Sequence, residues 1–230
     1  MIKVILCIAD MIPDDLIEKA RQIFDTNEFE EGTATAGWHA KLVKRNLQLT
    51  AQQPAVQSLR REFLSHIARH RVITGAALPK RFRPLLFNRY ITGMAYGSHV
   101  DDAIMGQSPQ GGEAGRADIS FTVFLSAPES HDGGELVIES TSGEQVYKLQ
   151  PGQAVLYPAT SLHRVTEVTR GVRDAAVGWI QSFVRDAGQR ELLFELDNVR
   201  RAIFRRDGKC PEFDSLSHIY SNLLRRWSEV

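Results

Sequence analysis

Three residues in the middle of the chain have the types and the spacing of metal ligands. His99 and Asp101 are separated by a single valine, and His163 follows in the later segment LYPATSLHRVTEV. Residues two apart in an extended strand point to the same side, so both side chains of the first pair can reach one ion. Two histidines and one carboxylate on one face of an ion leave its other positions open, as in non-haem Fe(II) oxygenases. The pattern therefore predicts a metal site.

Two further side chains have the chemistry to complete a pocket around such an ion. Arg173, in TRGVRDAAVGW, carries a permanently charged guanidinium that can bind a carboxylate. Tyr90, in FNRY shortly before the first histidine, is either a phenol donor to the same pocket or a core aromatic. A His-x-Asp pair alone is a weak signal, because such pairs arise by chance. The distal histidine and the arginine make a metal pocket the favoured interpretation.

The remaining histidine patterns favour no second metal site. His66 and His70 are four residues apart on a predicted helix, but no carboxylate stands in HExxH order between them. Packing or surface roles are favoured for both. His131 precedes a Gly-Gly turn, so we expect a loop residue without a ligand role.

The elements that must position these residues follow from hydrophobic periodicity. A short first strand is expected in the N-terminal apolar run, and helical spacing predicts one helix after Pro13 and another from about Pro54. From Leu85 to about Val184 the pattern changes to short runs rich in β-branched and aromatic residues: LLFNRYI, ADISFTVFLS, GGELVIES, EQVYKL, GQAVLYP, HRVTEV and DAAVGWIQSFV. Strands this short favour an antiparallel sandwich or barrel. SPQGGEAGRA is the loosest stretch and a candidate mobile loop.

Helical periodicity returns beyond Asp186 and predicts a helical hairpin that packs on the β-rich core or on a second subunit. We therefore expect three regions, residues 1–77 with a strand and helices that support the core, 78–184 with the β domain, and 185–230 with the helical extension. A homodimer through the C-terminal helices is plausible on this pattern.

Composition limits the classes of function. Lys plus Arg and Asp plus Glu both number 28, so no overall field draws the protein to nucleic acid or to an anionic membrane. The two cysteines, Cys7 and Cys210, have no CxxC partner and fit a reducing cytoplasm. The N-terminal run reaches Asp10 too soon for a signal peptide or a membrane span. We expect a cytoplasmic protein.

The segments around the four site residues resemble a known family. They are LPK, PLLFNRY, YGSHVD, DGGELV, LYPATSLHRVTEVTRGVR, GWIQS, LFELD and LLRRWSE. Together they are similar to the bacterial PKHD-type hydroxylases of the prolyl and lysyl hydroxylase superfamily, a branch often linked to iron uptake. The likeness runs from about Ala77 to the C-terminus and is far more specific than the metal triad alone.

The resemblance implies a double-stranded β-helix, also called a jelly roll, with Fe(II) on His99, Asp101 and His163. It also implies 2-oxoglutarate held through its distal carboxylate by Arg173, with O2 as the other cosubstrate and L-ascorbate as the accessory reductant. The expected activity is hydroxylation of an unidentified substrate, with succinate and CO2 as coproducts. Many members of the superfamily place a tyrosine beside the arginine, from a strand that reads FTVFLS here. Thr122 or Tyr90 is a candidate substitute.

Two other classes of function stay open. A non-catalytic sensor of iron, oxygen or 2-oxoglutarate would need the same four residues. A nucleic-acid demethylase of the same fold class carries a second arginine six residues after the first, whereas this chain has Trp179 there. The demethylase therefore ranks low. Substrate contacts are expected from the N-terminal helices, from Trp38 and from the loop 103–117.

Overall fold

The computed structural model of the protein describes residues 5–106, 114–140 and 142–230. Its α-helices are α1 (Asp14–Thr26), α2 (Pro54–Arg69), α3 (Ala187–Asp207) and α4 (Pro211–Trp227), with short helical turns η1 (Gly32–Thr35), η2 (Ala40–Val43), η3 (Ile73–Ala77) and η4 (Pro128–Ser130). Its strands are β1 (Leu6–Ile8), β2 (Phe29–Glu31), β3 (Lys44–Arg45), β4 (Leu47–Leu49), β5 (Pro79–Phe82), β6 (Leu86–Ile91), β7 (Ala95–His99), β8 (Ile104–Met105), β9 (Gly115–Arg116), β10 (Ile119–Phe124), β11 (His131–Asp132), β12 (Leu136–Ser140), β13 (Gly143–Tyr147), β14 (Ala154–Pro158), β15 (His163–Val165) and β16 (Arg170–Ser182).

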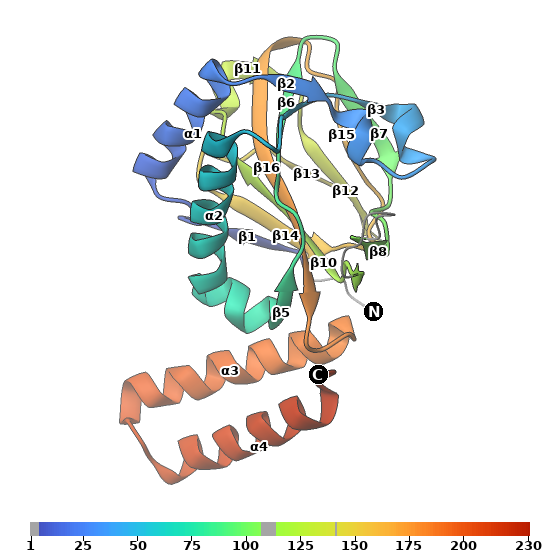
Figure 1. Cartoon of the computed structure of the whole chain (residues 1–230). Coiled ribbons are helices and arrows are strands. Elements are labelled where there is room, and N and C mark those ends of the chain that lie inside the picture. Colours follow the sequence, from blue (N-terminus) through green and yellow to red (C-terminus); the bar gives the residue numbers. More distant parts are fainter. Residues whose placement is uncertain (1–4, 107–113, 141) are drawn as a thin grey trace.

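Two antiparallel sheets form the body of the molecule (Figure 1). The larger sheet has the order β1-β14-β10-β16-β6-β4-β2, and the smaller has the order β13-β12-β15-β7-β3. Along the chain the strands alternate between them, because β6, β10, β14 and β16 belong to the larger sheet and β7, β12 and β15 to the smaller. This alternation is that of a jelly roll, and the predicted double-stranded β-helix is confirmed.

The main hydrophobic core lies between the larger sheet and the two N-terminal helices. Helices α1 and α2 cover the outer face of that sheet in Figure 1. The apolar stripes that the sequence predicts on both helices are buried there, namely Leu16, Ile17, Ala20, Ile23 and Phe24 on α1, and Val56, Leu59, Phe63 and Ile67 on α2. They pack with side chains of β10, β14 and β16 in one cluster. Burial on this scale is the dominant favourable contribution to folding.

Strand β16 separates this core from the interior of the sandwich. Ala176 and Ile180 belong to the helix-side core, whereas Arg173, Val177 and Trp179 line a cavity between the two sheets. The two sets fall on opposite faces because side chains alternate along a strand. One strand thus anchors the helices on one side and presents functional groups on the other.

The chain ends in an antiparallel pair of helices that extends away from the β body (Figure 1). Helix α3 begins after Asp186, whose carboxylate caps the amide of Gln189, and ends at Gly208, where the backbone has a φ of 69°. Leu193 of α3 packs with Leu78, Val184 and Trp227 where the pair joins the body. The predicted helical hairpin is therefore present.

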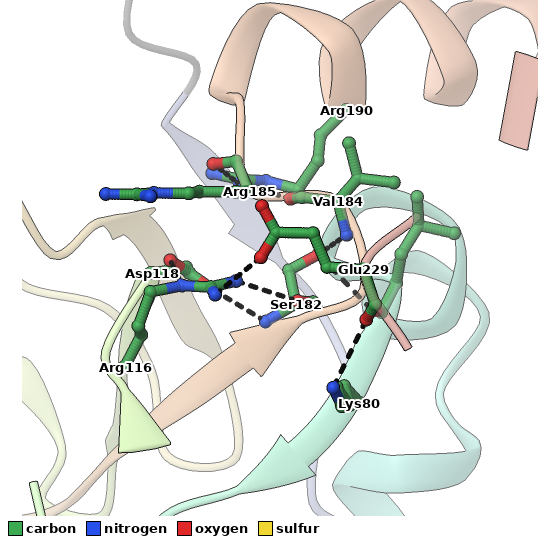
Figure 2. A network of polar contacts seen from close by, with 9 residues as sticks. Lys80, Arg116, Asp118, Ser182, Val184, Arg185, Arg190 and Glu229 are labelled. Atoms are coloured by element: carbon green, nitrogen blue, oxygen red, sulfur yellow. Dashed lines mark hydrogen bonds and ion pairs between the residues drawn. The ribbon is translucent and has the colours of Figure 1, made fainter. Parts of the chain in front are cut away.

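The last residues of the chain return to the β body. The Glu229 amide donates to the Phe183 carbonyl at 2.7 Å, and its carboxylate accepts from Arg116 of β9 at 2.6 Å. Arg116 also binds Asp118, as Figure 2 shows. The C-terminus is thereby joined to the β8–β9 ribbon beside the interior cavity.

Several local features differ from the sequence-based expectation. Strand β7 was not among the predicted runs, and it ends at His99, so Asp101 lies just beyond the strand. The segment 29–49 contains three short strands and two helical turns that hydrophobic periodicity did not reveal. The candidate loop SPQGGEAGRA lies mostly outside the described residues, and its last part includes β9.

None of the described helices is both long and apolar enough to cross a lipid bilayer.

Candidate metal centre

Strand pairing brings the two distant histidines together. Strands β7 and β15 are antiparallel neighbours, and His99 lies directly opposite His163 in their register. The ring centres are 4.2 Å apart. With Asp101 they offer three ligand atoms within 4.8 Å of one another, which is close enough to hold a single ion. The predicted triad is therefore assembled by the fold.

Backbone carbonyls orient both rings. The Nδ1 atom of His99 lies 2.8 Å from the Gly97 oxygen, and that of His163 lies 3.0 Å from the Ser161 oxygen. Because a carbonyl only accepts, each Nδ1 carries the proton and each Nε2 keeps its lone pair. Metal-binding histidines characteristically have such a second contact, which fixes the tautomer.

Asp101 is oriented by a third strand. Its Oδ2 accepts a hydrogen bond of 2.6 Å from the Ser120 hydroxyl on β10, and lies 3.8 Å from Nε2 of His163. Carboxylates are acceptors only when ionised, so this arrangement suits a charged ligand next to a cation. The carboxylate and the two free imidazole nitrogens form a donor set that fits a divalent transition metal.

Aromatic rings enclose the histidines. Tyr96 stacks on His99 with ring centres 3.6 Å apart, and Tyr157 meets His163 edge to face at 5.1 Å. Burial, reinforced by the neighbouring His163, lowers the pKa of His99 to about 4. This imidazole is therefore neutral at physiological pH, as a metal ligand must be.

Arg173 lies deep in the same cavity, with 2 % of its surface exposed. Its guanidinium carbon lies 5.1 Å from the Tyr90 ring centre and 5.7 Å from that of Phe124. Its buried Nε has no hydrogen-bond partner among the described residues. Burial lowers the pKa of Arg173 from its usual value, yet arginine stays charged in proteins. A buried guanidinium with a free Nε–H beside a metal triad has the chemistry to bind a carboxylate.

Tyr90 and Thr122, the candidate partners of Arg173, both line the cavity, and so does Tyr157. Burial raises the pKa of Tyr90 to about 12 and that of Tyr157 well above its usual value. Both phenols are therefore neutral donors. Tyr157 was missed by sequence reasoning, although it lies in the predicted strand GQAVLYP shortly before the distal histidine. Strand alternation alone does not tell which tyrosine shares a cavity with an arginine from another strand.

The cavity that joins these groups has a volume of about 330 Å³. Its walls come from both sheets and from the segment 35–48, which contributes Thr35, Lys44 and Gln48. Burial lowers the pKa of Lys44 to about 8, and the charge of Asp101 works against that shift. Sequence reasoning missed Lys44, because no pattern in the sequence places residue 44 beside residue 99.

Other residues and elements that the sequence analysis considered lie outside the cavity. Among the described residues that could share a metal, His66, His70 and His131 belong to no cluster. His131 is buried in the short strand β11, however, and is not the loop residue that we expected. Trp38 is 84 % exposed and does not line the cavity. Helices α1 and α2, from which we expected substrate contacts, pack on the opposite face of the larger sheet and contribute no residue to the cavity lining.

A jelly roll with a buried His-Asp-His triad and a buried arginine defines the class of the 2-oxoglutarate- and Fe(II)-dependent oxygenases. The model of the 2OG-Fe(II) oxygenase superfamily matches residues 85–181 of the chain, and that of the PKHD-type hydroxylase C-terminal domain matches residues 187–229. The chain belongs to the PKHD-type hydroxylases.

Individual relatives agree with this assignment. A PKHD-type hydroxylase of Rippkaea orientalis is 48% identical over 98% of this chain and 100% of its own length. One of Synechococcus elongatus is 50% identical over 93% of this chain and 94% of its own length. A crystal structure of a Pseudomonas putida prolyl-4-hydroxylase covers 77% of this chain and 92% of its own, with a TM-score of 0.54 and 19% identity. At that identity the likeness shows the fold alone.

Proposed function

We propose that the protein hydroxylates a substrate with O2 and 2-oxoglutarate, and that His99, Asp101 and His163 hold the Fe(II). The observation that carries this proposal is the joint orientation of the three ligand groups. The two histidines donate from Nδ1 to the Gly97 and Ser161 carbonyls, which directs both Nε2 lone pairs, and the Ser120 hydroxyl donates to the Asp101 carboxylate. Pre-oriented ligands of this kind are typical of functional metal sites.

Arg173 binds the distal carboxylate of 2-oxoglutarate in this proposal, with Tyr90 beside it. The buried guanidinium with an unpartnered Nε supports that role, and so does the Tyr90 ring against its face. When bound, iron and 2-oxoglutarate would supply the oxidation of a C–H bond by O2, in which one oxygen atom enters the substrate and the other enters succinate, with CO2 released. The protein orients the reactants and keeps water from them in the cavity.

A spectroscopic titration tests this assignment. Anaerobic addition of Fe(II) and 2-oxoglutarate to the wild-type protein should produce a weak visible charge-transfer band. Asp101→Ala should lose the band and stable Fe(II) binding while its circular dichroism is unchanged, because Asp101 lies beyond the strand and outside the cores. The neighbouring Asp102→Ala is the matched control and should keep the band. A wild-type protein that binds Fe(II) without developing the band would contradict the proposal.

A non-catalytic sensor of iron, oxygen or 2-oxoglutarate is the second candidate function. The same triad and arginine support it, because binding and turnover need the same groups. The two functions differ in one measurement: an enzyme releases succinate under O2 when its substrate is present, whereas a sensor binds 2-oxoglutarate and releases none with any candidate substrate. A nucleic-acid demethylase is disfavoured, since Trp179 of the cavity wall stands where that family has its second arginine.

Other parts of the expected function stay predictions. They are L-ascorbate as the accessory reductant, a role linked to iron uptake, a cytoplasmic location and a homodimer through the C-terminal helices. We also propose the division into residues 1–77, 78–184 and 185–230 on the basis of the elements that each contains. Purification with and without ascorbate, followed by measurement of succinate per Fe(II), tests the first of these.

A further inference from the structure

Lys44 is a buried cation in the cavity wall that the proposed chemistry does not use. It lies on β3, the edge strand of the smaller sheet, opposite Tyr96 of β7. Its side chain is 6 % exposed, and its ammonium lies 5.2 Å from the centre of the Tyr96 ring. That ring in turn stacks on His99. A single aromatic ring thus separates the ammonium from the metal triad.

The partners of Lys44 are neutral. Its Nζ donates to the Thr35 hydroxyl at 3.0 Å, and Thr35 lies 2.9 Å from the side-chain oxygen of Gln48. Gln48 donates to Asn88, which completes a wall of neutral amides. In the described part of the chain no acidic side chain lies within salt-bridge distance of the ammonium. An ammonium has three donors, so two of them have no partner in this wall.

A buried charge without a counter-ion costs free energy, and the proposed ligands do not supply one to Lys44. A divalent metal and the dianion 2-oxoglutarate cancel each other. The single charge of Asp101, which acts on Lys44 but binds the metal in the proposed site, offsets only one of the two cations Arg173 and Lys44. Asp102 also lines the cavity, but it is exposed and forms no ion pair with Lys44. One positive charge is therefore left over in the loaded site, on the opposite sheet from the arginine.

We propose that Lys44 binds a carboxylate of the substrate. This inference rests on the proposed function and adds the substrate class: a molecule with one carboxylate near the carbon that is oxidised. A carboxylate matches the single spare charge, whereas a phosphate monoester carries between one and two at neutral pH. The Thr35 hydroxyl holds the ammonium in position, and the cavity volume of about 330 Å³ suits a small molecule.

Binding measurements test the proposal without need of the true substrate. The protein is loaded anaerobically with Fe(II) and 2-oxoglutarate, and is titrated in a calorimeter with N-acetyl amino acids and with their primary amides. Each pair differs only in the charge of one group. We expect carboxylates to bind wild-type protein at least about tenfold more tightly than the matching amides, as for a hydrogen bond to a charged group.

Lys44→Met should abolish this preference. Lys44→Gln, which keeps a polar contact for Thr35, should abolish it too, and it serves as the test if the methionine variant misfolds. Lys41→Met removes an exposed lysine of the same segment and should leave the preference intact. The affinity for 2-oxoglutarate should stay within about twofold of wild type in all variants, because Arg173 is untouched.

Three outcomes of the acid and amide titrations would overturn the proposal: equal binding of acids and amides, binding of neither series, or a preference that survives both Lys44 substitutions. A large loss of 2-oxoglutarate affinity in Lys44→Gln would assign Lys44 to the cosubstrate instead and would also overturn it. Failure of wild-type protein to bind 2-oxoglutarate at all is a different result, since it rejects the proposed function itself.

Discussion

Arg173 is held in place by the protein before any ligand arrives. Its backbone is paired with Tyr90 of β6, and two aromatic rings flank its guanidinium. An incoming carboxylate therefore gains a charge-assisted contact with little further loss of side-chain freedom. Such pre-organisation favours tight and specific binding of one anion.

Replacement of Arg173 by methionine, which keeps most of the buried volume, tests this role. We expect Arg173→Met to weaken 2-oxoglutarate binding by roughly 10- to 100-fold, the range for a lost hydrogen bond to a charged group. Fe(II) binding should be preserved, because no triad atom is changed. Anaerobic calorimetry with Fe(II)-loaded protein measures both affinities.

Arg170→Met is the matched control, since Arg170 lies on the same strand with an exposed side chain paired to Asp132. It should bind 2-oxoglutarate as wild type does. Identical affinities in wild type and Arg173→Met would remove Arg173 from its assigned role.

His131 gives the protein a source of acid sensitivity outside the metal triad. It is buried, and burial together with the nearby charges of Lys148 and Arg173 lowers the pKa of His131 from 6.5 to about 4. Folding thus disfavours its charged form. Between these two pKa values the unfolded chain binds more protons than the folded one, so this contribution to stability falls as pH falls.

Substitution of His131 by glutamine should therefore flatten the pH dependence of stability between pH 6.5 and 4. The difference in slope should be at most about 1.4 kcal/mol per pH unit, the value for one proton. Urea unfolding of both proteins at several pH values measures it. Parallel curves for wild type and His131→Gln would show that this imidazole titrates alike in the folded and unfolded states.

Which residues could be predicted from the sequence depended on how local their signal is. His99 and Asp101 are neighbours in sequence, and Arg173 follows His163 in one continuous motif, so residue type and spacing were sufficient. Tyr157 and Lys44 approach the site through strand pairing between distant segments, which leaves no local pattern. The partner of a buried charge is therefore the kind of information that only the assembled sheets provide.

At the scale of elements, long periodic segments were predicted well and short ones were not. Helices α1 and α2 bury the very stripes that helical spacing indicated. Strand β7 was assumed from the His-x-Asp spacing and was not indicated by hydrophobic alternation, because Gly97 and Ser98 interrupt its apolar run. The strands β2, β3 and β4 have two or three residues each, which is too few to show a period of two.

The C-terminal tail connects the helical extension to the wall of the cavity. Glu229 binds Arg116 (Figure 2). The strand of Arg116, β9, pairs with β8, and Ile104 and Met105 of β8 line the cavity. Arg116 keeps further contacts to Asp118 and to the Ser182 carbonyl. The tail thus restrains a ribbon that other contacts also hold.

Glu229→Gln should loosen this ribbon without unfolding the protein. Hydrogen exchange of the β8 and β9 amides should become a few times faster, because a partly exposed ion pair contributes about 1 kcal/mol or less. Glu212→Gln changes an exposed acid of α4 and should leave these amides unaffected. Unchanged exchange in Glu229→Gln would show that Asp118 and Ser182 are sufficient to hold Arg116.

At the scale of the whole molecule, the body is a closed sandwich with helices on one face, whereas the C-terminal pair extends from it. In helix α4 no described residue is fully buried. On α3, Leu192 and Val199 are 56 % and 52 % exposed, and because they are seven residues apart they lie on one face of the helix. A protein with no net charge has no overall repulsion to keep such faces apart.

We therefore predict that two copies associate through the α3–α4 pairs. The double variant Leu192→Glu/Val199→Glu should sediment as a monomer at concentrations where wild type sediments as a dimer, since association would then bury unpaired carboxylates. Arg205→Glu changes the charge of the same helix away from this face and should remain dimeric. The Fe(II) and 2-oxoglutarate charge-transfer band should be equal in all three proteins, because the cavity is lined by residues outside the hairpin. Sedimentation of wild-type protein as a monomer across the whole concentration range would reject the dimer. Leu192 and Val199 would then be exposed to solvent in a monomeric protein.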